Sequence, residues 1–117
     1  MIKLAIIGGR DFNNYELLEN TLESYKAKIS LIVSGAARGA DSLGERWAID
    51  NNIKTLIFPA DWETHGKRAG FIRNEDIIKN CDAVIAFWDG NSKGTSHSLS
   101  LANKYNKPTK IIYYKWE

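Results

Sequence analysis

Five short runs of apolar residues recur along the chain, and within each run the apolar residues are nearly continuous. The runs cover residues 3–7, 31–33, 55–58, 83–87 and 110–114. Strands that are covered by helices on both faces have this pattern, because neither face meets water. The pattern therefore predicts five strands of a buried, mainly parallel sheet.

The segment after the first run has the spacing of an amphipathic helix. Large side chains recur there at i, i+3, i+7 and i+10, and they are Tyr15, Leu18, Leu22 and Tyr25. Asn13 or Asn14 is suited to cap the first turn, since an asparagine side chain accepts a hydrogen bond from a free backbone N–H group. This segment is predicted to be the first helix.

A second helix is predicted after the second run. Ser42 and Glu45 have the spacing of a capping box, which indicates a helix that begins at Ser42. Leu43 and Trp47 then share one face of this helix.

Two further helices are expected between the remaining runs. The third covers residues 67–79. The fourth begins near Thr95 or Ser96 and ends before Pro108, because proline cannot continue a helix.

Strand and helix thus alternate along the whole chain, which is typical of the doubly wound α/β class. We expect one Rossmann-like domain over residues 1–117, with a mainly parallel five-stranded sheet and helices on both faces. Proteins of this class bind ligands outside the carboxyl ends of the strands, near the point at which the strand order reverses. The loops that follow the strands are therefore the candidate site.

Composition narrows the range of partners. Lys and Arg number 16 against 14 Asp and Glu, so the formal net charge of +2 is too small to predict an extended nucleic-acid or membrane surface. Any anion site is then local. The apolar runs are too short to span a bilayer and the N-terminus has no signal-peptide pattern, so a cytoplasmic protein is expected.

Cysteine and histidine add little chemistry. Cys81 is the single cysteine and cannot form an internal disulfide; its place before an apolar run favours a buried structural thiol. His65 and His97 have no neighbouring His or Cys to complete a set of metal ligands. We therefore predict no metal site and no cofactor.

The loop after the first strand is Gly8-Gly9-Arg10-Asp11-Phe12. Two glycines let the backbone turn tightly and approach a ligand closely, and Arg10 adds a positive charge. The alternative is an ordinary turn in which Arg10 and Asp11 pair with one another.

The loop after the second strand is the strongest single candidate. It consists of small residues that lead directly into a helix, with Ser34, Gly35, Ala36, Arg38, Gly39 and Asp41 as candidate ligand residues. Free N–H groups and the helix dipole favour an anion at such a place. The alternative is that small residues serve close packing of strand and helix.

The loop after the fourth strand repeats the arrangement. Asp89, Gly90, Gly94 and Thr95 are its candidate ligand residues, and a second phosphate cradle is predicted there. Alternatively, Thr95 is only the N-cap of the following helix.

The long polar segment after the third strand carries Trp62 and several cations, and its length suits a lid over the site. Arg73 lies early in the third predicted helix. An arginine at such a position can clamp a phosphate with two N–H groups, although a solvated helix face explains it equally well.

Taken together, these loops resemble the SLOG superfamily, which groups DprA-like, LOG-like and YspA/YpsA-related proteins, and they resemble the small YspA-related members most. The matching segments are Gly8 to Phe12, Ser34-Gly35 with Gly39-Ala40-Asp41, Pro59-Ala60 with Trp62, Arg73-Asn74, and Trp88-Asp89-Gly90 followed by Gly94-Thr95. The resemblance implies a Rossmann-like fold that binds nucleotides or their derivatives, and it adds Asn74 to the candidate ligand residues.

LOG-type enzymes cleave the N-glycosidic bond of nucleoside 5′-monophosphates with an arginine and a glutamate. The resemblance places that arginine at Arg73, but Ser98 stands where the glutamate belongs. Serine cannot by itself stabilise an oxocarbenium-like state or activate water. Glu75, Asp41 or Glu45 would have to supply the carboxylate, and Arg73 with Glu75 is the candidate catalytic pair.

The loop residues and the resemblance together indicate three functions. The first is binding, as a sensor or a sequestering protein, of a nucleotide-derived small molecule. The second is LOG-like hydrolysis of a nucleoside monophosphate, and the third, less favoured at this net charge, is DprA-like binding of single-stranded DNA. A homodimer is also expected, with Trp47 or Tyr105 in the contact, although core packing explains both residues as well.

Overall fold

Five parallel strands form one sheet in the computed structural model, which describes residues 1–114. The strands are β1 (Ile2–Gly8), β2 (Ile29–Ser34), β3 (Lys54–Ile57), β4 (Ala83–Trp88) and β5 (Thr109–Tyr113). Their spatial order is β3-β2-β1-β4-β5, and each neighbouring pair is parallel. The predicted Rossmann-like α/β fold is confirmed.

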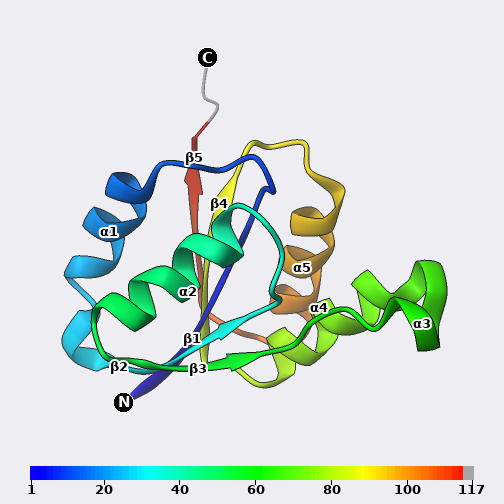
Figure 1. Cartoon of the computed structure of the whole chain (residues 1–117), viewed down its shortest axis with the longest axis horizontal. Helices are drawn as coiled ribbons and strands as arrows, with labels where there is room; N and C mark the ends of the chain where they lie inside the picture. Colours follow the sequence, from blue (N-terminus) through cyan, green and yellow to red (C-terminus); the bar gives the residue numbers. More distant parts are fainter. Residues whose placement is uncertain (115–117) are drawn as a thin grey trace.

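Helices cover both faces of this sheet (Figure 1). The helices α1 (Tyr15–Glu23) and α2 (Ala40–Asp50) pack on one face, and α4 (Ala69–Lys79) and α5 (Lys93–Lys104) pack on the other. The helix α3 (Trp62–His65) is a single turn, which a 3-10 turn over Gly66–Arg68 joins to α4. Within residues 1–114, no helix is both long and apolar enough to cross a membrane.

The strand β1 lies at the centre and contributes to both layers of the core. Leu4 and Ile6 pack with the α1 and α2 layer, whereas Ala5 and Ile7 pack with the α4 and α5 layer. Successive side chains of a strand point to opposite faces. A strand with a covered layer on each side therefore needs an uninterrupted apolar run, which is the pattern seen in the sequence.

The structure shows how far Trp47, Tyr105 and Cys81 are buried, which decides between their alternative roles. Trp47 is fully buried between α2 and the sheet, so its predicted role in a dimer contact is wrong. Tyr105 is half-buried against the opposite layer. Cys81 is buried, its thiol donates to the carbonyl of Ile78 at 3.3 Å, and burial raises its pKa to about 11, as expected of an unreactive structural thiol.

The predicted capping box at Ser42 does not form. The helix α2 begins at Ala40, because Gly39 adopts φ 77° and ψ −126° and the N–H group of Ala40 donates to the carbonyl of Gly9 at 3.2 Å. The hydroxyl of Ser42 instead donates to the carbonyl of Ala37. A contact with the loop after β1 thus determines where the helix begins.

The other helix boundaries also differ from the sequence prediction. The Oδ1 atom of Asp89 accepts hydrogen bonds from the N–H groups of Asn91 and Ser92, each at 2.8 Å, and α5 then begins at Lys93 instead of near Thr95. The third predicted helix, 67–79, is divided where the 3-10 turn meets α4. Asn14 is the N-cap of α1 and accepts from the N–H group of Leu17.

The strand order reverses between β1 and β4, which are neighbours in the sheet. The connection that follows β1 runs to the α1 side, and the connection that follows β4 runs to the α5 side. The two loops therefore separate above the carboxyl ends of these strands and leave a crevice, where ligands bind in sheets of this class.

Candidate functional site

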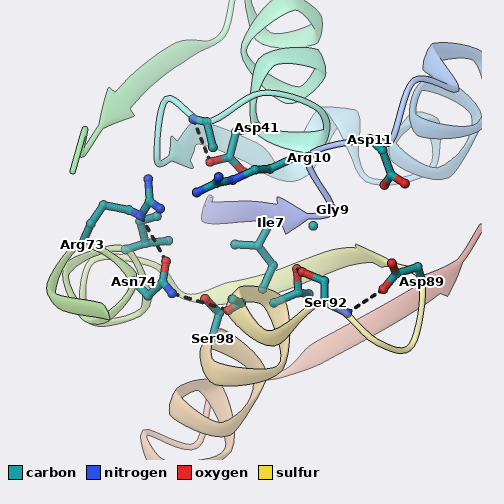
Figure 2. Close-up of a pocket in the computed structure, with 15 residues that line it drawn as sticks. Ile7, Gly9, Arg10, Asp11, Asp41, Arg73, Asn74, Asp89, Ser92 and Ser98 are labelled. Atoms are coloured by element: carbon teal, nitrogen blue, oxygen red, sulfur yellow. Dashed lines mark hydrogen bonds between the residues drawn. The ribbon is translucent and has the colours of Figure 1, made fainter. Parts of the chain in front are cut away.

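A cavity of about 400 Å³ opens at this point (Figure 2). It brings together most of the candidate ligand residues, which are Gly8, Gly9, Arg10, Asp11, Asp41, Arg73, Asn74, Asp89, Gly94 and Thr95. Its other lining residues are Ile7, Ala37, Ile77, Ser92 and Ser98. The volume lies in the range of small-molecule sites.

Sequence reasoning missed Ile7, Ala37, Ile77 and Ser92 as lining residues. Ile7 and Ile77 are apolar members of a strand and a helix, so nothing in the pattern separates them from the rest of the core. Ser92 was detectable, because serine directly before a helix is a common N-cap.

A second cavity of about 310 Å³ shares Arg10, Ala37 and Arg73 with the first. It contains three further candidate residues, Gly35, Ala36 and Arg38. The predicted loop after β2 therefore divides its residues between two adjoining cavities.

Four candidate residues line neither of these two cavities. Ser34 is buried and its hydroxyl donates to a carboxylate oxygen of Glu45 at 2.6 Å. Gly39 packs against the loop after β1, and Gly90 adopts φ 87° in the turn after β4.

Glu75, the fourth of these, lies on a part of α4 that does not line the cavity. Its carboxylate forms an ion pair with Lys79 at 3.0 Å, and hydrogen bonding to Lys79 lowers the pKa of Glu75. The structure therefore does not bring Glu75 together with the other candidate residues.

Arg73 connects the two halves of the site. Its Nη1 atom donates to the carbonyl of Gly35 at 2.6 Å, and its Nε atom donates to the Oδ1 atom of Asn74 at 3.1 Å. The amide of Asn74 in turn donates to the carbonyl of Gly94 at 3.4 Å. These bonds hold the guanidinium at the boundary of both cavities, so a solvated helix face does not describe Arg73.

Arg10 points toward the same space from the loop after β1 (Figure 2). Across residues 1–114 it forms neither an ion pair nor a hydrogen bond, while its neighbour Asp11 accepts a hydrogen bond from the hydroxyl of Tyr114 at 2.5 Å. The predicted alternative, a turn closed by an Arg10–Asp11 pair, is therefore wrong. Burial lowers the pKa of Arg73, the charge of Asp41 opposes this shift, and the charge of Arg10 lowers the pKa further. The two cations therefore lie near enough to repel one another.

Asp41 explains the shape of the loop after β2. Its Oδ2 atom accepts hydrogen bonds from the N–H groups of Gly35 and Ala37, at 3.1 Å and 3.3 Å. These two donors are satisfied by the protein itself and are not available to a phosphate. The sequence prediction that this loop cradles a phosphate with its backbone is wrong for these two groups.

The amino end of α5 remains available to an anion. Gly94 and Thr95 lie in its first turn and line the first cavity. The N–H groups in the first turn of a helix have no partner within the helix, and the helix dipole favours negative charge there. Thr95 is not the N-cap: it lies inside α5, buried, with its hydroxyl 3.4 Å from that of Ser92.

The buried carboxyl of Asp41 has a pH-dependent consequence. Burial raises its pKa from 3.8 to about 6, although backbone hydrogen bonds and Arg73 oppose this shift. Between pH 4 and 6 the folded protein then binds more protons at Asp41 than the unfolded chain does. The stability that comes from this extra proton binding is therefore complete below pH 4 and is lost as the pH rises through 6. We expect the free energy of unfolding of the Asp41→Asn variant to gain up to about 3 kcal/mol relative to wild type between pH 4 and 7. Urea denaturation of both proteins at several pH values measures this difference, and a difference that does not change with pH would contradict the expectation.

Within residues 1–114, no group of His, Cys, Asp and Glu side chains is arranged to hold a metal ion. His97 instead lies 3.3 Å from the amide of Asn74 and packs edge-on against Phe71. The first cavity therefore offers two guanidinium groups, an amide, hydroxyls, a helix terminus and the carboxyl groups of Asp11, Asp41 and Asp89.

These features define a Rossmann-like α/β protein with a cavity at the carboxyl ends of its strands that is lined, among the described residues, by two arginines and three aspartates. Residues 2–65, more than half of the chain, match the family described as the YspA, cpYpsA-related SLOG family. The chain belongs to this family.

Two known proteins are similar to this chain. The chain is 34% identical to the Gene 61 protein of Mycobacterium phage D29, over 92% of this chain and 94% of that protein. Among solved structures, it resembles DNA processing protein A from Helicobacter pylori, which binds single-stranded DNA, with a TM-score of 0.73 and 24% identity. The match covers 94% of this chain and 64% of that one, and at this identity it shows the fold.

Proposed function

We propose that this protein binds a nucleotide or nucleotide-derived ligand and holds its phosphate between Arg10 and Arg73. The observation that carries the proposal is that both guanidinium groups line both cavities and lie near one another at their boundary. Arg10 has no acidic partner among the described residues. Two neighbouring cations repel each other, and an anion placed between them removes that cost. Arginine is suited to this role because its planar N–H groups match the oxygens of a phosphate.

Three further observations support a phosphate at this place. The site lies where the strand order reverses, the usual ligand position in this fold class. The amino end of α5 faces the same cavity and favours an anion. Membership of a SLOG family and the fold of a DNA-binding protein are in keeping with a ligand built from nucleotides.

The arrangement of carboxylates favours binding over glycosidic cleavage. Ser98, which the sequence resemblance aligns with the LOG-type glutamate, lines the cavity but carries no carboxylate. Glu75 is paired with Lys79 outside the cavity. Asp41 lines the cavity, but one of its oxygens is already committed to the loop after β2. Glu75 therefore lacks access to the cavity, and the carboxylate of Asp41 already binds backbone N–H groups of the protein.

Replacement of Arg10 by alanine tests the proposal with little risk to the fold, because Arg10 is exposed. Hydrogen bonds to charged groups contribute about 1.5–3 kcal/mol, so we expect about a 10- to 100-fold weaker affinity for a nucleoside monophosphate. Isothermal titration calorimetry with a panel of nucleotides at low salt measures this effect.

The matched control is Arg46→Ala. Arg46 is an exposed arginine on α2 that stacks on Tyr15 and lines neither cavity, so its loss removes the same charge at a different place. Equal weakening in both variants would indicate a non-specific effect of net charge. Failure of every nucleotide to bind the wild-type protein would refute the proposed function.

A further inference from the structure

The second cavity differs in character from the first. Besides the two shared arginines, it is lined by Pro59, Ala60 and Trp62, by Arg38, and by small residues of the loop after β2. Within the described part of the chain, the second cavity thus presents the rings of Trp62 and Pro59 beside three arginines and contains no carboxylate, whereas the first cavity presents hydroxyls, an amide and carboxylates. A single phosphate would not require such a surface.

Trp62 is the distinctive residue of this cavity. It is 54% exposed, which is unusual for the largest apolar side chain. Its position is nevertheless defined: it begins α3, whose N-cap Asp61 accepts from the N–H group of Thr64 at 3.1 Å. Gly70 of α4 lies beneath it, since a Cβ atom built there would be 3.6 Å from the Cη2 atom of Trp62. The indole therefore has support on one side and solvent on the other.

We infer that the second cavity is a base-binding subsite in which the indole of Trp62 stacks on a nucleobase. This inference rests on the proposed function, because it takes the phosphate to lie at Arg10 and Arg73. Aromatic side chains stack on any base, since every base has a π-face. The subsite therefore recognises the presence of a base more than its identity.

The position of the arginines defines the class of ligand. Arg10 and Arg73 line both cavities, so a phosphate that they hold lies at the boundary and not at an end. A base on Trp62 leaves the first cavity, of about 400 Å³, for the group on the other side of the phosphate. The ligand thus has two nucleoside-like arms joined by a phosphodiester or a pyrophosphate. A free dinucleotide and consecutive nucleotides of a single strand share this chemistry.

The test compares four probes on the wild-type chain: ribose 5-phosphate, adenosine 5′-monophosphate, the dinucleoside phosphate ApA, and an octamer of deoxyadenylate. The variants are Trp62→Ala and Trp62→Phe, with Arg10→Ala as the reference for phosphate binding. Loss of one aromatic stacking contact corresponds to about a 5- to 150-fold weaker affinity. We expect this loss for ApA in Trp62→Ala, unchanged affinity for ribose 5-phosphate, and largely retained affinity for ApA in Trp62→Phe.

The outcomes distinguish the base subsite from the proposed function. If Trp62→Ala binds ApA as tightly as wild type while Arg10→Ala does not, the base subsite is refuted and the proposed function stands. If the monophosphate binds as tightly as ApA, the ligand with two arms is refuted. If no probe binds the wild-type chain, both proposals fail. Equal affinity for ApA and the octamer would indicate a ligand of dinucleotide size. Tighter and strongly salt-dependent binding of the octamer would instead indicate a single strand. Either result supports a ligand with a phosphodiester.

Discussion

The Arg73→Ala variant is expected to lose about 100-fold or more in affinity for a nucleoside monophosphate, the largest effect of any substitution at this site. Under the proposed function Arg73 contributes in two ways: its charge faces the phosphate, and its bonds to Gly35 and Asn74 hold the loop after β2 against α4. Removal of one member of a buried, hydrogen-bonded charge pair usually costs 2–5 kcal/mol. Calorimetric titration of the variant and the wild-type protein measures the loss.

Two companion variants show whether the loss has this origin. Arg68→Ala removes a neighbouring exposed arginine that lines neither cavity, and it should bind as wild type does. Arg73→Lys keeps the charge but cannot hold Gly35 and Asn74 at once with a planar fork, so we expect only partial recovery. Full recovery in the lysine variant would mean that charge alone matters and would contradict the connecting role given to Arg73.

The Gly39→Ala variant is expected to lose about 3–5 kcal/mol of its free energy of unfolding. Gly39 adopts φ 77° and ψ −126°, a region that residues with a Cβ atom rarely enter and that costs about 1–3 kcal/mol for them. A Cβ atom there would also lie 2.2 Å from the carbonyl oxygen of Gly9, which accepts the hydrogen bond that begins α2. Movement of that carbonyl displaces the loop that carries Arg10, so ligand affinity should fall together with stability.

Gly94→Ala is the matched control for this change. A Cβ atom at Gly94 meets nothing within 4 Å, and the residue lies in the first turn of α5 with an ordinary helical backbone. Alanine is favoured over glycine within a helix by roughly 0.5–1 kcal/mol, so the control should be neutral or slightly more stable. Thermal or urea denaturation of both variants measures the difference, and equal stabilities would show that the conformation of Gly39 is not required.

The loops that form the candidate site were largely predictable from the sequence. The contacts between their side chains were less predictable. Arg10, Arg73, Asp41 and Gly94 all follow strands or lie near helix starts in the sequence, and the structure brings them to one cavity. Glu75 is only two residues from Arg73, yet two residues along a helix turn the side chain by about 200° and carry it to another side. Proximity in sequence was a poor guide to proximity in the site.

The sequence by itself determined the fold class of this protein, because continuous apolar runs are typical of covered strands and because alternation with helices indicates parallel crossovers. The expected burial holds for β1, β2 and β4, whereas β3 and β5 at the edges of the sheet are largely exposed. The tertiary structure decided where the helices begin and what the loops do. The start of α2 depends on a hydrogen bond from Ala40 to Gly9, and the loop after β2 depends on Arg73, 38 residues after Gly35. Side-chain spacing within one segment carries no information about such partners, since these contacts exist only after the strands have brought distant loops to the same edge of the sheet.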